Sequence, residues 1–262
     1  MNTLSLFDLH DKTVLITGSE SGIGLALAEG LAGAGAKIIL NGLSHEKLSK
    51  AENLLKNQGA SVSVLPFDVS KITEAKSAIE NYSKTKGSID ILVNNAGVNI
   101  RGDFIDFKEE DWRRIFDVNL NGAMIVTQAI IPQMRKNNAG KIINICSLYS
   151  ALGRASVVPY SVSKGGLKMF TKALCTELAE YNIQVNGITP GFIETEMTQS
   201  LKKDLSFNKW LSNRTPAGRW GIPKDLVGAV VFLASDASNF VNGQILHIDG
   251  GITASVKCLI LN

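Results

Sequence analysis

The chain has few of the residues that cross-link a fold or bind metal ions. Its three cysteines, Cys146, Cys175 and Cys258, lie far apart in 262 residues and form no Cys-x-x-Cys pair. A disulfide framework or a cysteine-based zinc site is therefore not expected. The three histidines are scattered as well, which favours surface or structural roles over metal ligation. We predict a reduced protein without a metal site.

Charge of one sign and long apolar runs are equally scarce. The net charge is +3 and no run of lysine or arginine occurs, so nucleic-acid binding has no electrostatic support. No apolar stretch approaches the ~20 residues that a membrane span needs. Residues 1–12 contain two aspartates and no apolar signal-peptide core. These absences predict a cytoplasmic protein that has neither a nucleic acid nor a membrane as a partner.

What the chain does have is a regular alternation of apolar, β-branched runs with longer helical patterns. The expected strands cover residues 12–18, 36–41, 61–67, 89–94, 141–145, 183–188 and 244–248. The helical patterns between them include residues 23–34, 44–56, 70–86, 109–135 and 160–180, with Ser44 as an N-cap. Strands joined by helical crossovers imply a parallel sheet. We predict an α/β fold, a Rossmann-type, doubly wound, seven-stranded parallel sheet with helices on both faces, in a single domain over residues 1–262.

One segment departs from this regularity. Residues 191–221 follow a strand end and mix polar residues with Trp210 and Trp220. A long insertion at such a place is a candidate lid over a substrate site. A helical pair packed on the edge of the sheet is the other interpretation, and both can hold at once.

A glycine-rich turn joins the first expected strand to the first helix. Residues 17–24 read Thr-Gly-Ser-Glu-Ser-Gly-Ile-Gly, so that Gly18, Gly22 and Gly24 are spaced as Gly-x-x-x-Gly-x-Gly. Glycines there let the backbone turn tightly and let a pyrophosphate approach the N-terminus of the helix. The spacing differs from the Gly-x-Gly-x-x-Gly of the standard fingerprint. Its place at the start of a βαβ pattern nevertheless predicts a dinucleotide site.

Polar groups also follow the third and fourth expected strands. Asp68 could accept a hydrogen bond from an adenine amino group or cap the helix that follows, and the sequence does not separate the two interpretations. The turn Asn94-Asn-Ala-Gly97 consists of small residues that let a cofactor pass close to the backbone. Its asparagine amides are equally suited to clamp neighbouring strands.

Tyr160, Lys164 and Ser147 are the candidates for acid–base chemistry. Residues four apart share one face of a helix, so Tyr160 and Lys164 can enter the same pocket. A free phenol has a pKa near ~10 and carries protons poorly at neutral pH. An adjacent ammonium would lower that pKa, and a serine hydroxyl could hold a carbonyl oxygen. Since the Tyr-x-x-x-Lys spacing is common on exposed helices, its weight depends on the rest of the chain.

Together these motifs resemble the short-chain dehydrogenase/reductase family over essentially the whole chain. The chain carries the motifs of this family in the family's order: the turn 17–24, Asp68-Val69, Asn94-Asn-Ala-Gly97, Asn119, Ser147, Tyr160-x-x-x-Lys164 and Pro190-Gly191. Each motif alone is weak, but the set in this order is highly specific. The resemblance implies an NAD(P)-dependent enzyme that interconverts an alcohol and a ketone, with the hydride carried by the cofactor.

The resemblance also implies roles for individual residues. Tyr160 is expected to be the general acid/base, Lys164 to lower its pKa and bind the nicotinamide ribose, and Ser147 to hold the substrate oxygen. Asn119 is expected to anchor a water of the proton relay. The implied cofactor-binding residues are Gly18, Ser21, Gly22, Ile23, Gly24, Gly42, Leu43, Asp68, Val69, Asn95, Ala96, Gly97, Tyr160, Lys164, Pro190, Gly191, Ile193 and Thr195.

A closer resemblance, to gluconate 5-dehydrogenases, rests mainly on the second half of the chain. The matching segments are 144–147, 151–154, 168–169, 182–187, 195–198 and 214–221, together with 4–7 and 241–251. A sugar acid needs a cation for its carboxylate, preferably a planar guanidinium. Arg154 and Arg101 are the candidates beside Ser147 and Tyr160, and the alternative for each is a solvated or interface arginine. Relatives often carry two basic residues near position 100, whereas this chain has Arg101 followed by Asp103. The lost positive charge and the added negative one leave a 2-deoxygluconate or another polyol as an alternative substrate.

The choice between NAD and NADP depends on the residues after the second strand. An acidic residue there would bind the ribose hydroxyls of NAD and repel a 2′-phosphate, but Gly42 occupies the place. The basic residues that similar NADP enzymes carry at Leu43 and Ser21 are absent too, and Glu20 adds negative charge nearby. The candidate replacement cations are His45 and Lys47. Because the carboxylate is missing at position 42, we expect a slight preference for NADP, with NAD as the alternative.

We therefore predict an NAD(P)-dependent oxidoreductase that interconverts D-gluconate and 5-keto-D-gluconate as a homotetramer, the common assembly of related enzymes. A 3-oxoacyl-[acyl-carrier-protein] reductase is the alternative among enzymes, because it shares the catalytic residues. It would need a basic docking surface, for which Arg113, Arg114 and Lys136 are available. A nucleotide-binding sensor without turnover is the alternative outside enzymes, and the presence of all four catalytic residue types argues against it.

Overall fold

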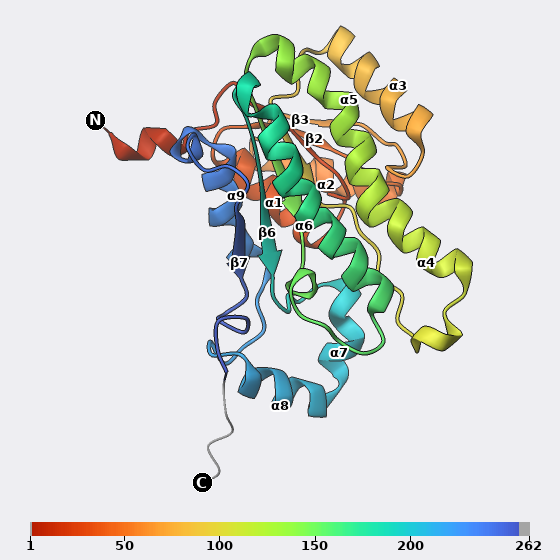
Figure 1. Cartoon of the computed structure of the whole chain (residues 1–262). Coiled ribbons are helices and arrows are strands. Elements are labelled where there is room, and N and C mark those ends of the chain that lie inside the picture. The colour runs from red at the N-terminus through yellow and green to blue at the C-terminus, as the bar shows by residue number, and fades with distance from the viewer. Residues whose placement is uncertain (1, 257–262) are drawn as a thin grey trace.

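A seven-stranded parallel sheet forms the centre of the computed structural model, which describes residues 2–256 (Figure 1). The strands are β1 (Thr13–Ile16), β2 (Lys37–Leu40), β3 (Val62–Val64), β4 (Ile91–Asn94), β5 (Gly140–Ile145), β6 (Ile183–Pro190) and β7 (Ile245–Ile248). They are ordered β3-β2-β1-β4-β5-β6-β7, and all neighbouring strands are parallel. The predicted fold class is confirmed. Because the strand order reverses between β1 and β4, a crevice opens at their carboxyl ends, where sheets of this kind bind ligands.

Helices cover both faces of the sheet. They are α1 (Gly22–Gly33), α2 (His45–Asn57), α3 (Ile72–Thr85), α4 (Glu109–Phe116), α5 (Gly122–Asn137), α6 (Val158–Leu178), α7 (Gln199–Lys203), α8 (Leu205–Arg214) and α9 (Val227–Ala234). Ser44 caps α2 as expected, since its hydroxyl accepts from the Lys47 N–H at 3.2 Å. Helix α6 begins two residues earlier than the sequence pattern indicates, with Pro159 in its first turn, where the missing N–H costs no hydrogen bond.

The sheet divides the hydrophobic core into two halves, one on each of its faces. Val14 and Ile16 face α1, α2 and α9, whereas Leu15 faces α3, α5 and α6. All three side chains are fully buried, because successive strand residues point to opposite faces and both faces are covered. This double burial explains why the strands appear in the sequence as continuous apolar runs rather than alternating ones.

The helix expected over residues 109–135 is interrupted. A π-helical turn over Asp117–Asn121 joins α4 to α5, and such turns often mark functional sites. By length and composition alone, the run Glu109–Asn137 is long and apolar enough to cross a membrane. Here it packs against α3 and α6 on one side of the sheet. The expectation that no membrane is a partner stays a prediction.

Residues 191–221 lie beyond the carboxyl ends of the strands rather than on a face of the sheet (Figure 1). They contain α7 and α8 and an aromatic cluster in which the Phe192 ring lies 5.5 Å from Phe207 and 5.8 Å from Trp220. The Trp220 indole donates to Asn208 Oδ1 at 2.6 Å. The segment thus has a small core of its own at the end of the sheet where the crevice opens.

Candidate active site

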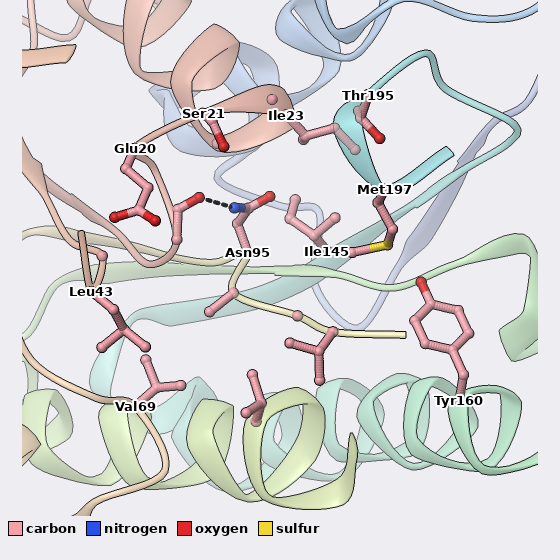
Figure 2. A pocket seen from close by; sticks show the side chains of 18 of the residues that line it. Glu20, Ser21, Ile23, Leu43, Val69, Asn95, Ile145, Tyr160, Thr195 and Met197 are labelled. Atoms are coloured by element: carbon pink, nitrogen blue, oxygen red, sulfur yellow. Dashed lines mark hydrogen bonds between the residues drawn. The ribbon is translucent and has the colours of Figure 1, made fainter. Parts of the chain in front are cut away.

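A cavity of about 770 Å³ follows the carboxyl ends of the strands (Figure 2). Every cofactor-binding residue expected from the sequence lines this cavity, and so does Ser147. Figure 2 shows Glu20 and Leu43 toward one end, Tyr160 toward the other and Asn95 between them. Asn119, Arg101 and Arg154 do not belong to its lining. One groove therefore joins the glycine-rich turn to the candidate catalytic tyrosine.

The glycine-rich turn has the backbone that only glycine adopts easily. Gly18 has a φ of +61° and Gly22 a φ of +57°. A Cβ on Gly18 would lie 2.9 Å from the Cα of Ala96, so a side chain would push the turn away from the end of β4. Ser21 gives the first turn of α1 no side-chain hydrogen bond. Residues 21–24 line the groove at this uncapped helix N-terminus, and such an N-terminus is suited to bind a phosphate.

Asn95 and Asn94 fix the groove floor in two different ways. Asn95 Nδ2 donates to the carbonyls of Thr17 at 2.9 Å and Gly18 at 2.8 Å. Asn94 Nδ2 instead donates to Thr127 Oγ1 at 3.0 Å and Asn144 Oδ1 at 2.8 Å, inside the core. Both amides thus act as clamps, and Asn95 holds the turn after β4 against the glycine-rich turn.

Asp68 accepts two hydrogen bonds from Ser70 with one of its oxygens. Its Oδ1 accepts from the N–H of Ser70 at 2.8 Å and from the Ser70 hydroxyl at 2.7 Å, just before α3. The side chain also lines the groove next to Val69. The expected helix cap is not formed, because α3 has Lys71 as its N-cap and no side-chain cap hydrogen bond, whereas Asp68 binds Ser70 ahead of the helix. The contact with an adenine amino group stays a prediction.

The opposite end of the groove brings together Ser147, Tyr160 and Lys164. Ser147 follows β5, and the other two residues come from the first turns of α6. Both side chains enter the same cavity, as the four-residue spacing predicts. The Lys164 ammonium donates to the Ile145 carbonyl at 2.7 Å and lies 6.0 Å from the centre of the Tyr160 ring.

Burial controls the titration of this pair. It raises the pKa of Tyr160 to about 12, against an opposing interaction with the Ser147 hydroxyl. It lowers the pKa of Lys164 to about 8. The expected lowering of the Tyr160 pKa by Lys164 is not found, because the ammonium turns toward Ile145 and the cost of desolvating a phenolate dominates. These groups by themselves keep Tyr160 a neutral phenol at neutral pH.

Asn119 lies in the π-helical turn and is almost completely buried. Its Oδ1 accepts from the Val98 N–H at 2.7 Å, and its Nδ2 donates to the Val98 carbonyl at 2.9 Å and to Ser163 Oγ at 3.2 Å. The carboxamide is thus committed to protein partners. A water of the expected proton relay would have to bind the Asn119 backbone.

Beyond Tyr160, a second cavity of about 360 Å³ is lined by aromatic residues and arginine. Tyr149 packs edge-to-face on Tyr160 with ring centres 6.3 Å apart. Arg154 Nη1 donates to the Tyr149 hydroxyl at 3.1 Å, and its guanidinium lies 5.0 Å from the centre of the Phe207 ring. Arg101 Nη1 reaches Ser200 Oγ in α7 at 3.5 Å.

Arg101 and Arg154 form a pair of like charges on this side. Burial, and next the positive charge of Arg154, lower the pKa of Arg101. Within residues 2–256 neither guanidinium forms an ion pair with a carboxylate, and Asp103 is exposed. The Gly102 N–H donates to the Ser156 carbonyl at 3.1 Å and ties the two arginine loops together. Two guanidiniums held in this way without an acid favour an anionic ligand.

Three contacts were not expected from the sequence. Tyr149, two residues after Ser147, connects Arg154 to Tyr160. Val98 holds Asn119, a contact for which the sequence carries no signal. Glu196 accepts from the Lys47 ammonium at 3.0 Å, which links the start of α2 to the segment 191–221.

The cysteines take no part in a metal cluster in the portion of the chain that the structure describes. Cys146 and Cys175 are free and buried, and burial raises the pKa of the Cys146 thiol to about 11. Cys258 lies outside the described residues. No group of three or more His, Cys, Asp or Glu side chains among residues 2–256 is arranged to hold a metal ion.

Known proteins resemble this chain over nearly its full length. A family model described as enoyl-(acyl carrier protein) reductase matches residues 18–253. The 5-keto-D-gluconate 5-reductase of Escherichia coli strain K12 is 48% identical over 251 residues, which are 96% of this chain and 99% of that protein. The gluconate 5-dehydrogenase of Gluconobacter oxydans is 43% identical over 256 residues, 98% of this chain and 100% of that protein. A crystal structure of a gluconate 5-dehydrogenase from Burkholderia cenocepacia in complex with NADP and tartrate has a TM-score of 0.95 and 45% identity, covering 97% of this chain and 100% of that one.

Proposed function

The chain belongs to the short-chain dehydrogenase/reductase family, and on that premise we propose that it interconverts D-gluconate and 5-keto-D-gluconate with a nicotinamide cofactor. The observation that carries this proposal is the unneutralised pair Arg101 and Arg154 beside Tyr149 and Tyr160. A sugar acid offers the carboxylate that these cations lack and a carbonyl for Tyr160. The names of the similar enzymes from E. coli and G. oxydans support the same substrate class.

In the proposed reaction, the nicotinamide supplies or accepts the hydride, and the protein moves one proton. Tyr160 donates its phenol proton to the ketone oxygen, and the Ser147 hydroxyl holds the same oxygen. A Tyr160 pKa of about 12 keeps the phenol protonated, as ketone reduction requires. Oxidation of the alcohol requires the phenolate and is therefore favoured as the pH rises.

Lys164 and Asn119 support this proton transfer. A Cβ on Gly97 would lie 3.4 Å from Asn119 Oδ1 and 3.6 Å from Lys164 Nζ, so Gly97, which lines the groove, lies close to both side chains. We assign the Lys164 ammonium to the ribose hydroxyls next to the nicotinamide. The backbone of the π-helical turn at Asn119 is assigned to the relay water, because its side chain is already bound to Val98.

The carboxylate is assigned to Arg154, with Arg101 as the second cation. The hydrogen bond from Arg154 to the Tyr149 hydroxyl fixes one end of the guanidinium and leaves other N–H donors for a carboxylate. The B. cenocepacia relative was crystallised with tartrate, a hydroxy acid that carries carboxylates. An anion between the two arginines would relieve their repulsion.

The enzyme uses a nicotinamide dinucleotide, and the residues of the groove fit one. The uncapped N-terminus of α1 suits the pyrophosphate, and the backbone of Gly18 and Gly22 leaves room for its approach. We propose that the chain takes NADP or NAD, with a slight preference for NADP. The NADP complex of the B. cenocepacia relative supports NADP.

Assembly, location and lid are further parts of the proposal. A homotetramer is supported by apolar side chains left exposed on α5 and α6, which include Met124, Val162 and Met169. We propose a cytoplasmic enzyme whose residues 1–262 form a single domain. Segment 191–221 is assigned as the lid, since it contacts Arg101 through Ser200 and Lys47 through Glu196.

A 3-oxoacyl thioester is the second candidate substrate. The walls of the second cavity include Leu148, Leu152, Phe192 and Trp210, which suit an acyl chain better than a sugar acid. A neutral acyl chain offers no anionic partner for the two arginines. We therefore place the sugar acid ahead of the 3-oxoacyl thioester.

Absorbance of the reduced cofactor, followed with a panel of ketones, tests the proposed function. The panel contains 5-keto-D-gluconate, other keto sugars and a 3-oxoacyl thioester, each with NADH and with NADPH. We expect the largest kcat/KM with 5-keto-D-gluconate. Turnover of the thioester without turnover of 5-keto-D-gluconate would reject the proposed substrate, and turnover of no ketone would reject an oxidoreductase of this class.

A further inference from the structure

Glu20 lies where the adenosine ribose of a dinucleotide would be recognised. Figure 2 shows its carboxylate at the same end of the groove as Leu43. Glu20 Oε2 accepts from the N–H of Ser44, the N-cap of α2, at 2.9 Å. A Cβ on Gly42 would lie 2.7 Å from the Glu20 carboxyl carbon. The Glu20 carboxylate therefore fills the volume that a side chain at position 42 would occupy.

An acid at this place has a known effect on nucleotide binding. A carboxylate at the end of the second strand accepts hydrogen bonds from ribose hydroxyls and repels a 2′-phosphate. Gly42 cannot supply that group, but Glu20 brings one to the same position from the glycine-rich turn. Within residues 2–256 the structure records a hydrogen bond to Glu20 Oε2 and none to Oε1. Oε1 is therefore available to a ribose hydroxyl.

The nearby cation is already engaged. Lys47 Nζ lies 3.0 Å from Glu196 Oε2, and the pKa of Lys47 is raised by this contact first and by the charge of Glu20 to a smaller extent. Ser21 and Leu43, which also line this end of the groove, carry no charge. A 2′-phosphate, with a charge near −2 at neutral pH, would meet the Glu20 carboxylate while the Lys47 ammonium is held by Glu196.

We propose that Glu20 is a cofactor-specificity residue of this enzyme, accepting the ribose hydroxyls of NAD(H) and disfavouring the 2′-phosphate of NADP(H). The inference rests on the proposed function only in taking a nicotinamide dinucleotide as the ligand. Gly42 by itself would permit a preference for NADP, and the Glu20 carboxylate weakens that preference. We therefore expect this chain to use NADH alongside NADPH.

Glu20→Gln is the sharpest variant for a test. Glutamine keeps the length of the side chain and its carbonyl can still accept from Ser44, so the turn keeps its hydrogen bond while the charge is lost. Glu52→Gln is the matched control, because Glu52 pairs with Lys56 farther along α2. We expect the ratio of kcat/KM for NADPH to that for NADH to rise about tenfold in Glu20→Gln, and to change less than twofold in the control.

A binding measurement separates this inference from the proposed reaction. Calorimetric titration with ADP-ribose and with 2′-phospho-ADP-ribose needs no ketone and no turnover. We expect Glu20→Gln to bind 2′-phospho-ADP-ribose about tenfold more tightly than the wild type and ADP-ribose no more tightly. If the wild type and Glu20→Gln bind 2′-phospho-ADP-ribose with the same affinity, and also bind ADP-ribose with the same affinity, the inference is overturned, whatever the substrate panel shows. A tenfold shift without turnover of any ketone would support Glu20 and reject the proposed function alone.

Discussion

Replacing Lys164 with methionine should stabilise the fold while it abolishes activity. The Lys164 side chain is only 4% exposed, and burial lowers its pKa from 10.5 to about 8. At neutral pH the protein therefore holds an ammonium in a place that disfavours its charge. Methionine has a similar length and carries no charge.

The expected gain follows from two opposing contributions. A pKa lowered from 10.5 to about 8 corresponds to roughly 3 kcal/mol of destabilisation at a pH below both values. Loss of the 2.7 Å hydrogen bond to the Ile145 carbonyl leaves a buried acceptor without its donor and costs about 1–2 kcal/mol. The variant should be more stable by roughly 1–2 kcal/mol at pH 7, with a Tm higher by a few degrees.

The pH dependence has a definite sign. The folded-state pKa of Lys164 lies below its unfolded value, so the unfolded state binds more protons between about pH 8 and 10.5. Wild-type stability therefore rises with pH in that window relative to the variant. The advantage of methionine should shrink by about 2 kcal/mol between pH 7 and pH 9.5. Lys141, whose pKa burial also lowers to about 8, contributes equally to both proteins and cancels.

Urea unfolding at pH 7 and pH 9.5, at equal protomer concentration, measures both quantities. Lys172→Met on the exposed side of α6 serves as the control and should change stability little at either pH. A Lys164→Met protein that is less stable than the wild type at pH 7 would refute the reasoning. A stability difference that does not change with pH would refute it as well, since the destabilisation could not then come from titration.

Three further results are expected. Tyr160→Phe should lower kcat by about 10²–10⁴ while cofactor affinity, followed by tryptophan fluorescence, stays within about twofold; a residual activity near that of the wild type would remove Tyr160 as the acid. Arg154→Met should raise KM for 5-keto-D-gluconate roughly 10- to 100-fold with a smaller effect on kcat, and Arg154→Lys should recover only part of the loss; an unchanged KM would leave the carboxylate to another residue. Gly18→Ala should cost at least ~1–2 kcal/mol in urea unfolding, because φ is +61° and the new Cβ would lie 2.9 Å from Ala96. Gly33→Ala, whose Cβ would meet nothing within 4 Å, is its control and should be neutral or stabilising.

Several features of the site could be predicted from the sequence because they depend on local chemistry. The apolar runs indicated the parallel sheet, since strands buried on both faces need continuous apolar residues. The glycine-rich turn could be identified because few other residues accept the positive φ of Gly18 and Gly22. The four-residue spacing of Tyr160 and Lys164 was enough to place both side chains in one pocket.

Other features could not be predicted because they depend on residues distant in the chain. Glu20 lies over Gly42 only after β2 has paired with β1. Arg101 and Arg154 approach each other because the Gly102–Ser156 hydrogen bond joins their loops. No local pattern contains either contact.

The sequence by itself determined the fold class, the groove and the identity of the candidate catalytic residues. Only the tertiary structure decided how those residues titrate and which charges surround them. Tyr160 and Lys164 illustrate the difference, because their spacing fixed a shared pocket but suggested a lowered tyrosine pKa. Burial, together with the turn of the Lys164 ammonium toward Ile145, raises that pKa instead. Desolvation depends on everything packed around a group, and the chain brings those neighbours together only when it folds.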